Sequence, residues 1–129
     1  MTKRLHNLFV LAIPLFIVHG LEEYFTGFYK IDASFLYTIG RLSNNTAKTF
    51  LFFQVMVWLV LAATAALRLP KRWTLALLTF WGIVMIFELH HVYEALILGG
   101  YYPGLVTALL FAIIGYFYWK ELIKNYKQL

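Results

Sequence analysis

The sequence predicts an all-α membrane domain, a single bundle of four transmembrane helices spanning residues 1–129. Of the 129 residues, 62% are hydrophobic and only 13% are charged, whereas a typical soluble domain is about 25% charged and about 45–50% apolar. A globule this small cannot hide so much apolar surface, because small domains bury the smallest fraction of their surface. Lipid is therefore the expected solvent, and an ordinary soluble domain and a disordered chain are both excluded.

Four apolar segments are each long enough to cross a bilayer, which takes roughly 20 helical residues. Their apolar residues do not alternate with polar ones, so the strands of a transmembrane barrel are excluded. The first segment follows two basic residues, as a signal peptide would, but no cleavage site of small residues comes after it. We therefore expect it to be retained as a helix. The predicted spans are residues 5–25, 49–69, 73–98 and 104–120.

The connections between the spans set the expected topology. The loop at 26–48 is long, and its FLYTIGRL stretch is predicted to form a short interfacial or re-entrant helix on the outer side. The link GGYYP is so short that the third and fourth helices must be antiparallel neighbours. Eight basic residues flank one set of helix ends and three flank the other, which predicts that both termini are cytoplasmic. The eight are Lys3, Arg4, Arg68, Lys71, Arg72, Lys120, Lys124 and Lys127.

The charge balance indicates partners in the membrane. The chain carries 11 Lys and Arg against 6 Asp and Glu, a formal charge of +5. Because the basic residues lie between the spans, they are assigned to topology and to anionic lipid headgroups, and no nucleic-acid partner is expected. The chain has no cysteine, which excludes thiol nucleophiles, disulfides and thiolate metal sites. The expected location is the cell membrane, as a multi-pass protein; in a bacterium this would be the inner membrane.

Ionisable side chains inside the predicted spans are the main functional signal, because such residues are rare there and usually functional. They form two clusters with helical spacing, so that each cluster falls largely on one side of its helix. Both clusters lie in the outer half of the bilayer, and Gln54 and Thr107 fall at a similar depth. The first cluster contains His19, Glu22 and Glu23, and the second contains Glu88, His90, His91 and Glu94.

The carboxylates need a counter-charge, since each costs roughly 2.5–3.5 kcal/mol at a helix centre. No Lys or Arg lies within a span, so the candidates are a protonated histidine, a proton on the carboxylate, or a metal ion. Glu121, by contrast, lies among three lysines and is predicted to be a solvated residue at a helix end. His nitrogen with Glu oxygen suits zinc, iron or manganese.

All seven residues of the two clusters are therefore predicted as metal ligands, with Glu22, Glu23 and Glu94 as the catalytic carboxylates. Two kinds of site remain open. Glu-x-x-His is used in di-iron helical bundles, and a single zinc site needs two His and one Glu with a second Glu as general base. Three alternatives need no catalytic metal: a hydrogen-bonded structural network, a His/Glu acid–base isomerase, and a carrier for protons or metal ions.

The motif HGLEE at 19–23 resembles the signature of the HXXEE-domain family, a set of small prokaryotic membrane proteins. HHVYEA at 90–95 and YYPGLVTALL at 101–110 are similar to the second half of that family. The resemblance implies a compact integral membrane domain with His19, Glu22 and Glu23 as motif residues, and His90, His91 and Glu94 as their counterparts. It implies no particular reaction.

The resulting hypothesis is a metal-dependent membrane enzyme acting on a hydrophobic, lipid-like small molecule. A di-iron site would support oxidation of the substrate, and a zinc site would support hydrolysis. The expected cofactor is a divalent metal, iron or zinc, and the expected partners are membrane lipids and the substrate. A homodimer that completes the site is an open alternative.

Overall fold

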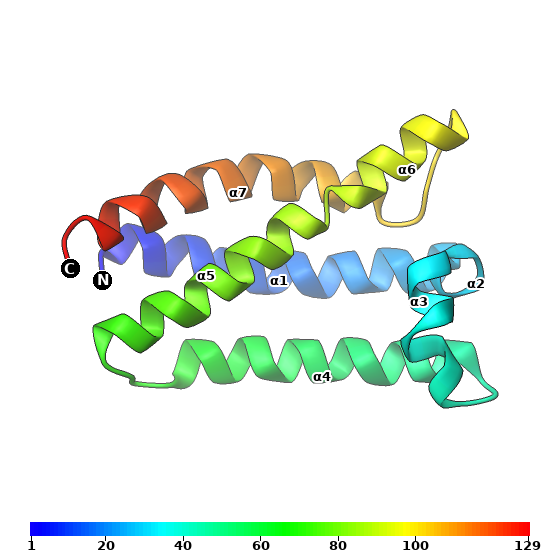
Figure 1. Cartoon of the computed structure of the whole chain (residues 1–129), viewed down its shortest axis with the longest axis horizontal. Coiled ribbons are helices and arrows are strands. Elements are labelled where there is room, and N and C mark those ends of the chain that lie inside the picture. Colours follow the sequence, from blue (N-terminus) through cyan, green and yellow to red (C-terminus); the bar gives the residue numbers. More distant parts are fainter.

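The computed structural model describes all 129 residues, and every regular element in it is a helix (Figure 1). Four helical segments are long and apolar enough to cross a membrane, which confirms the predicted fold class. The third of them consists of two helices in tandem, and the side on which the termini lie stays a prediction. The four segments are α1 (Lys3–Thr26), α4 (Thr46–Ala66), α5 (Lys71–Phe87) with α6 (His90–Leu98), and α7 (Leu105–Tyr126).

The helix ends follow local signals in the sequence. The hydroxyl of Thr2 accepts a hydrogen bond from the Leu5 backbone N–H and caps the start of α1. Gly27, with φ of +85°, ends α1 in the left-handed conformation that glycine adopts without strain. The fourth span was predicted to end at residue 120, but α7 continues to Tyr126. It does so because Leu122 and Asn125 beyond the first lysine are fully buried.

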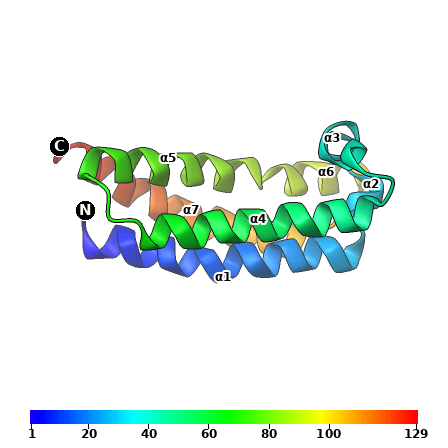
Figure 2. The ribbon, with the colours of Figure 1, turned by 90° about the horizontal axis from the view of Figure 1, so that it is seen from below.

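The loop predicted to hold one interfacial helix contains three short elements. These are α2 (Phe28–Ile31), α3 (Ala33–Tyr37) and the 3-10 helix η1 (Ile39–Leu42). Asp32 begins α3 by accepting the Phe35 backbone N–H at 2.7 Å. Figures 1 and 2 show these elements folded over one end of the bundle, opposite the two chain termini. We call the end with the termini the proximal end and the other the distal end.

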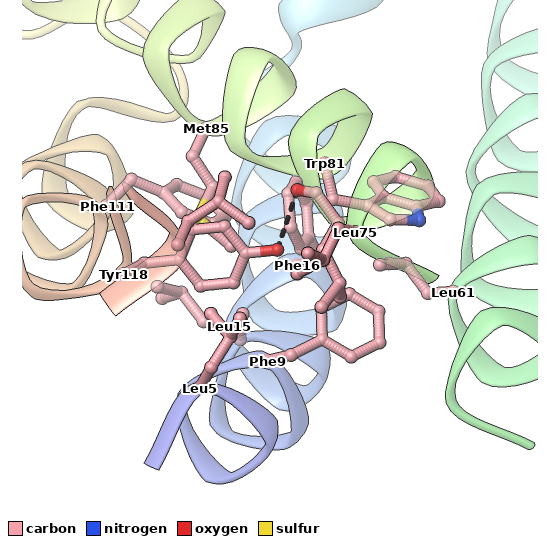
Figure 3. Packing of buried hydrophobic residues seen from close by; sticks show 13 residues of the cluster. Leu5, Phe9, Leu15, Phe16, Leu61, Leu75, Trp81, Met85, Phe111 and Tyr118 are labelled. Atoms are coloured by element: carbon pink, nitrogen blue, oxygen red, sulfur yellow. Dashed lines mark hydrogen bonds between the residues drawn. The ribbon is translucent and has the colours of Figure 1, made fainter. Parts of the chain in front are cut away.

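The bundle is built around α1, which packs against both α7 and α4, while α5 packs against α7. The apolar core fills the proximal part and includes Phe9, Phe16 and Phe111 (Figure 3). The Tyr118 hydroxyl is fully buried there and donates a hydrogen bond to the Leu78 carbonyl at 2.7 Å. On α1 the core stops at Phe16. The next inward-facing residue toward the distal end is a histidine.

Candidate metal centre

Four ionisable side chains meet in the distal half of the bundle: His19, Glu23, Glu88 and His91. One potential ligand atom from each lies within 4.8 Å of the other three. The shortest separation is 2.9 Å, between His19 Nε2 and Glu88 Oε2. His91 Nε2 lies 3.2 Å from Glu23 Oε1 and 3.3 Å from Glu88 Oε2, and His19 Nε2 lies 3.6 Å from Glu23 Oε1. We call these four residues the His/Glu cluster.

Two helical segments supply the whole His/Glu cluster. His19 and Glu23 are four residues apart on α1, so they lie on one face of that helix. Glu88 and His91 lie on either side of the break between α5 and α6 (Figure 1). At the break, the backbone bonds from Leu89 N–H to Ile86 and from His91 N–H to Glu88 span three residues rather than four. This tighter turn, which contains no proline, places the Glu88 and His91 side chains side by side.

The His/Glu cluster is buried and has no cationic side chain other than histidine. His91 is fully buried, and His19 and Glu23 are only 3% and 4% exposed. Every ion pair made by Glu23 or Glu88 is with a histidine. Buried carboxylates require a partner for their charge. The arrangement therefore needs either protons on the histidines or carboxylates, or a cation among the four groups.

Gln54 on α4 completes one wall of the cluster. Its Nε2 donates to Glu23 Oε2 at 2.9 Å. The side chain reaches Glu23 because α1 and α4 approach closely at Gly20, where a Cβ would lie 2.5 Å from Gln54 Oε1. Gln54 thus holds the Glu23 carboxylate in place, with the other carboxylate oxygen directed at the histidines.

Glu22 contacts His19 through Thr107, at the start of α7. Thr107 Oγ1 donates to Glu22 Oε2 at 2.5 Å and lies 2.6 Å from His19 Nδ1. Because the single hydroxyl proton goes to the carboxylate, the Thr107 oxygen accepts a bond from His19 Nδ1–H. This bond leaves Nε2 directed at the cluster, as in a metal-ligating histidine whose other ring nitrogen is held by a hydrogen-bond acceptor.

The Glu22 carboxylate is itself held by several donors. It accepts the backbone N–H groups of Val106 at 3.1 Å and Thr107 at 3.0 Å, in the first turn of α7. A helix N-terminus favours negative charge. Tyr101 in the preceding loop donates its hydroxyl at 2.6 Å. Burial, together with this bond to Glu22, raises the pKa of Tyr101, so the phenol stays a donor at neutral pH.

Gly104 lies directly against both histidine rings. A Cβ there would lie 2.8 Å from Cε1 and Nδ1 of His91, and 3.0 Å from Cε1 of His19. Its φ of +88° also favours glycine. The Nδ1 atom of His91 is buried and has no hydrogen-bond partner. The loop before α7 therefore forms the back wall of the cluster and leaves no room for a larger residue.

Of the seven ligands predicted from the sequence, the structure brings four together and leaves Glu22, His90 and Glu94 outside the group. Glu22 instead supports His19 from behind, through the Thr107 hydroxyl. The His90 ring packs against that of His91, with centroids 4.0 Å apart. Its two nitrogens face other groups, because Nδ1 lies 3.0 Å from the Phe87 carbonyl oxygen and Nε2 lies 3.9 Å from Asp32 Oδ2. Glu94 is half-buried one turn further along α6. Of the α6 residues, His91 shares a face with Glu88, whereas His90 and Glu94 lie on other faces of the helix.

Asp32 and Gly104 are parts of the site that the sequence reasoning missed. Asp32 is 5% exposed and accepts the Tyr102 hydroxyl at 2.8 Å. Burial and this contact raise the pKa of Tyr102. Asp32 lies outside every predicted span, where an acidic residue is common. Nothing in its sequence context therefore identifies it as a site residue. A glycine just before α7 was visible, but its contact with two histidines depends on the tertiary structure.

Two cavities reach the His/Glu cluster. An apolar groove of about 370 Å³ runs between α4 and α5 and ends at His19, Gln54 and Glu88. A more polar cavity of about 390 Å³ lies beneath α3 and η1 and reaches Glu23 and Glu88. Glu88 is the one member of the cluster that borders both cavities, and its side chain is 16% exposed. Small molecules can therefore approach the cluster from the lipid side and from the distal end.

Comparison with known proteins gives one match. The model of a family described as "protein of unknown function with HXXEE motif" matches residues 10–119. No curated protein and no solved structure matches the chain. The matched region contains the complete His/Glu cluster, and of the motif residues His19 and Glu23 lie in the cluster while Glu22 supports it from behind. The chain belongs to the HXXEE family.

Proposed function

We propose that the His/Glu cluster binds one divalent metal ion and that the protein is a metal-dependent membrane enzyme acting on a lipid-like substrate. The observation that supports this is the spacing of the four donors: the four His–Glu separations run from 2.9 to 3.6 Å, and all donor atoms lie within 4.8 Å of one another. Ligands bonded at about 2.0–2.1 Å in a tetrahedron lie about 3.3 Å from one another. An ion at the centre of the cluster would therefore be within bonding distance of each donor after small adjustments.

Charge favours the same assignment. Two ionised carboxylates and two neutral histidines carry a charge of −2, which a divalent cation neutralises. The hydrogen bond from His19 Nδ1 to Thr107 keeps Nε2 free for such an ion. Without the ion, the same balance needs two protons on the histidines. Metal uptake should therefore release protons, and metal affinity should fall as the pH is lowered.

The number of donors supports a mononuclear site. A di-iron centre of the helical-bundle type uses four Glu and two His, whereas two Glu and two His meet here. Zinc in catalytic sites commonly takes two His and one Glu. Two His and one carboxylate hold zinc in hydrolases and mononuclear iron in oxygenases. The second carboxylate of the cluster, available as a general base, favours the zinc hydrolase.

Glu88 is the best candidate for the general base. His19, Glu23 and His91 are the more buried donors and would hold the metal. The metal would lower the pKa of a bound water molecule. Glu88, which borders both cavities, would take the proton from this water during attack on a carbonyl centre. It would then pass the proton to the leaving group, so the reaction consumes one water molecule and needs no oxidant.

Elemental analysis of protein purified without chelators or a metal-affinity step tests the proposal. We expect close to one metal ion per chain, and none in the His19→Ala/His91→Ala double variant. The Glu121→Gln variant, which loses a buried carboxylate at the proximal end, is the matched control and should keep its metal. A metal-free wild-type protein that also fails to bind added zinc, iron or manganese would disprove the proposal. Iron in place of zinc would favour oxidation of the substrate over hydrolysis.

A metal-free acid–base isomerase is the second candidate. The observation in its favour is that His19 Nε2 and Glu88 Oε2 are already at hydrogen-bonding distance, 2.9 Å. Such a pair can transfer a proton without an ion. The two candidates differ in their response to chelation: a catalytic metal makes activity sensitive to it, whereas a His/Glu isomerase keeps its activity in the chelator.

A further inference from the structure

The two cavities at the His/Glu cluster share part of their walls. Phe53 and Gln54 on α4, Val84 on α5 and Glu88 at the helix break line both of them. A molecule could thus extend from the groove between α4 and α5 into the distal cavity and pass Glu88 midway. The chemical difference between the two cavities indicates what kind of molecule fits.

The groove suits an aliphatic chain. Eight of its eleven lining residues are hydrophobic, and its three polar ones lie at the end next to the cluster. Along α4 it extends from Gln54 to Val60, six residues or about 9 Å. Phe53, Met56 and Val60 on this wall are each 39–49% exposed, so the groove is open along the side of the bundle that faces lipid. A chain can enter it laterally from the bilayer.

The distal cavity suits a polar group without negative charge. Its ionisable residues are Glu23, Asp32, Glu88 and His90, and no Lys or Arg lines it. The hydroxyl groups of Ser34 and Thr38 add hydrogen-bonding capacity. A metal ion at the cluster would neutralise Glu23 and Glu88, but Asp32 would keep its charge. Phosphate or carboxylate in this cavity would be repelled, and an amine would be attracted.

We propose that the two cavities together bind a single-chain amphiphile with an amine-bearing headgroup, the chain in the groove and the headgroup beside Asp32. The junction of chain and head then lies at Glu88. That this junction is the bond cleaved rests on the proposed function, whereas the binding itself does not. A phospholipid is a poorer occupant, because its phosphate would meet the carboxylates.

Native mass spectrometry of the full-length protein, released from detergent after exposure to defined amphiphiles, tests this. The probes share one saturated chain and carry an amine, a glycerol or a phosphate headgroup, and they compete in equal amounts. We expect one amphiphile per chain, with the amine form retained at least about tenfold over the phosphate form. Metal content is measured on the same samples, so that failure of the metal-binding proposal and failure of the amphiphile-binding proposal can be distinguished.

Two variants probe the two cavities. Asp32→Asn keeps one oxygen to accept the Phe35 N–H, since Asn caps helices as Asp does, and its amide N–H can donate to the Tyr102 hydroxyl oxygen in place of the lost acceptor. This variant should reduce the amine preference severalfold. Val60→Trp fills the far end of the groove at an exposed position and should weaken binding of the full chain more than that of one half as long. Glu121→Gln, far from both cavities, should change neither.

Equal retention of all three headgroups, a preference for phosphate, or a Val60→Trp variant with unaltered chain-length dependence would each overturn the proposal. If Asp32→Asn fails to fold, the headgroup competition on the wild-type protein still decides it. Amine-selective binding to protein that proves unable to bind metal would support this inference and reject the metal-dependent mechanism.

Discussion

The two ends of the bundle each bury carboxylates, but they neutralise them differently. At the proximal end, Glu121 is 5% exposed, lies 3.6 Å from the Arg4 guanidinium and 3.5 Å from the Thr2 hydroxyl. Asn125 ties the same region together by accepting the Thr2 backbone N–H at 2.8 Å. At the distal end, Glu23 and Glu88 have only histidines as charged partners. A permanent cation therefore lies beside the buried carboxylate at the proximal end, and none is paired with the carboxylates of the His/Glu cluster.

This difference separates a structural carboxylate from a functional one. Glu121 is paired with a side chain that is permanently charged and also contacts the Thr2 hydroxyl, so its counter-charge comes from the chain itself. The distal carboxylates depend on groups that titrate or on an ion that can be exchanged. Burial alone therefore does not identify a functional residue in this protein, and the nature of the counter-charge does.

Removing the distal donors should have the largest effect. We expect His19→Ala/His91→Ala to abolish metal binding, a loss greater than the about 10–100-fold caused by removing a residue that only supports a ligand. Circular dichroism should show the helices retained, because the larger of the two apolar clusters, with 13 buried residues, lies proximal to both histidines. Retention of stoichiometric metal in this variant would mean that the ion binds elsewhere, and that the distal carboxylates are not neutralised by a metal ion.

A methyl group at Gly104 should have the next largest effect. Gly104→Ala puts a Cβ 2.8 Å from the His91 ring, whereas Gly99 has a similar positive φ of +72° but nothing within 4 Å. Both alanine variants should lose about 1 kcal/mol or more of stability through the backbone conformation. Only Gly104→Ala should also lose metal affinity, as measured by competition with a chelating dye. Equal metal affinity in the two variants would disprove the role of Gly104 as a wall of the site.

Loss of the support behind His19 should have a smaller effect. Glu22→Gln and Thr107→Val should each lower metal affinity about 10–100-fold, because His19 is no longer held with Nδ1 protonated. Thr49→Val is the matched control, since the Thr49 hydroxyl bonds only to the Asn45 carbonyl. If Glu22 were itself a ligand, Glu22→Gln would lower metal affinity as much as His19→Ala does. Comparing these two single variants decides between a supporting role and a ligand role for Glu22.

The proximal carboxylate should have the smallest effect. Glu121→Gln should leave metal affinity unchanged and lower stability by at most about 1 kcal/mol, because Arg4 is largely exposed and its pairing is screened by solvent. A shift of a few degrees in the melting temperature is the expected result. A fall in metal affinity would show that the two ends are coupled, and Glu121 would then not be a purely structural carboxylate.

The fold could be predicted from the sequence because it depends on local properties. Apolar segments of about 20 residues define spans in any sequence, and the structure places all four close to the predicted positions. Glu121 was predicted to be solvated on account of its lysine neighbours, and this is wrong. Its partner, Arg4, is far away in the sequence, and only the packing of α1 against α7 brings the two together.

The candidate site could be predicted only in part. Helical spacing identified residues that share a face, which worked for His19 and Glu23 on the continuous helix α1. It did not separate Glu22 from them, because a helix face about 100° wide includes both neighbours. Around Glu88 the spacing rule worked for His91, three residues on, which lies in the cluster with Glu88. His90 and Glu94 fall about 160° and about 120° from Glu88 at about 100° per residue, so they belong to other faces of the helix.

The helix α4 contributes no donor to the His/Glu cluster, yet four of its residues besides Gln54 line the groove that leads there. The groove residues on α4 thus lie on a different helix from the four donors of the His/Glu cluster. Substitutions along one helix could alter the length or branching of the molecule that is accepted while the reacting groups stay unchanged. Family members that share the HXXEE residues could in this way diverge in what they act upon through changes at Phe53, Met56, Val57 and Val60.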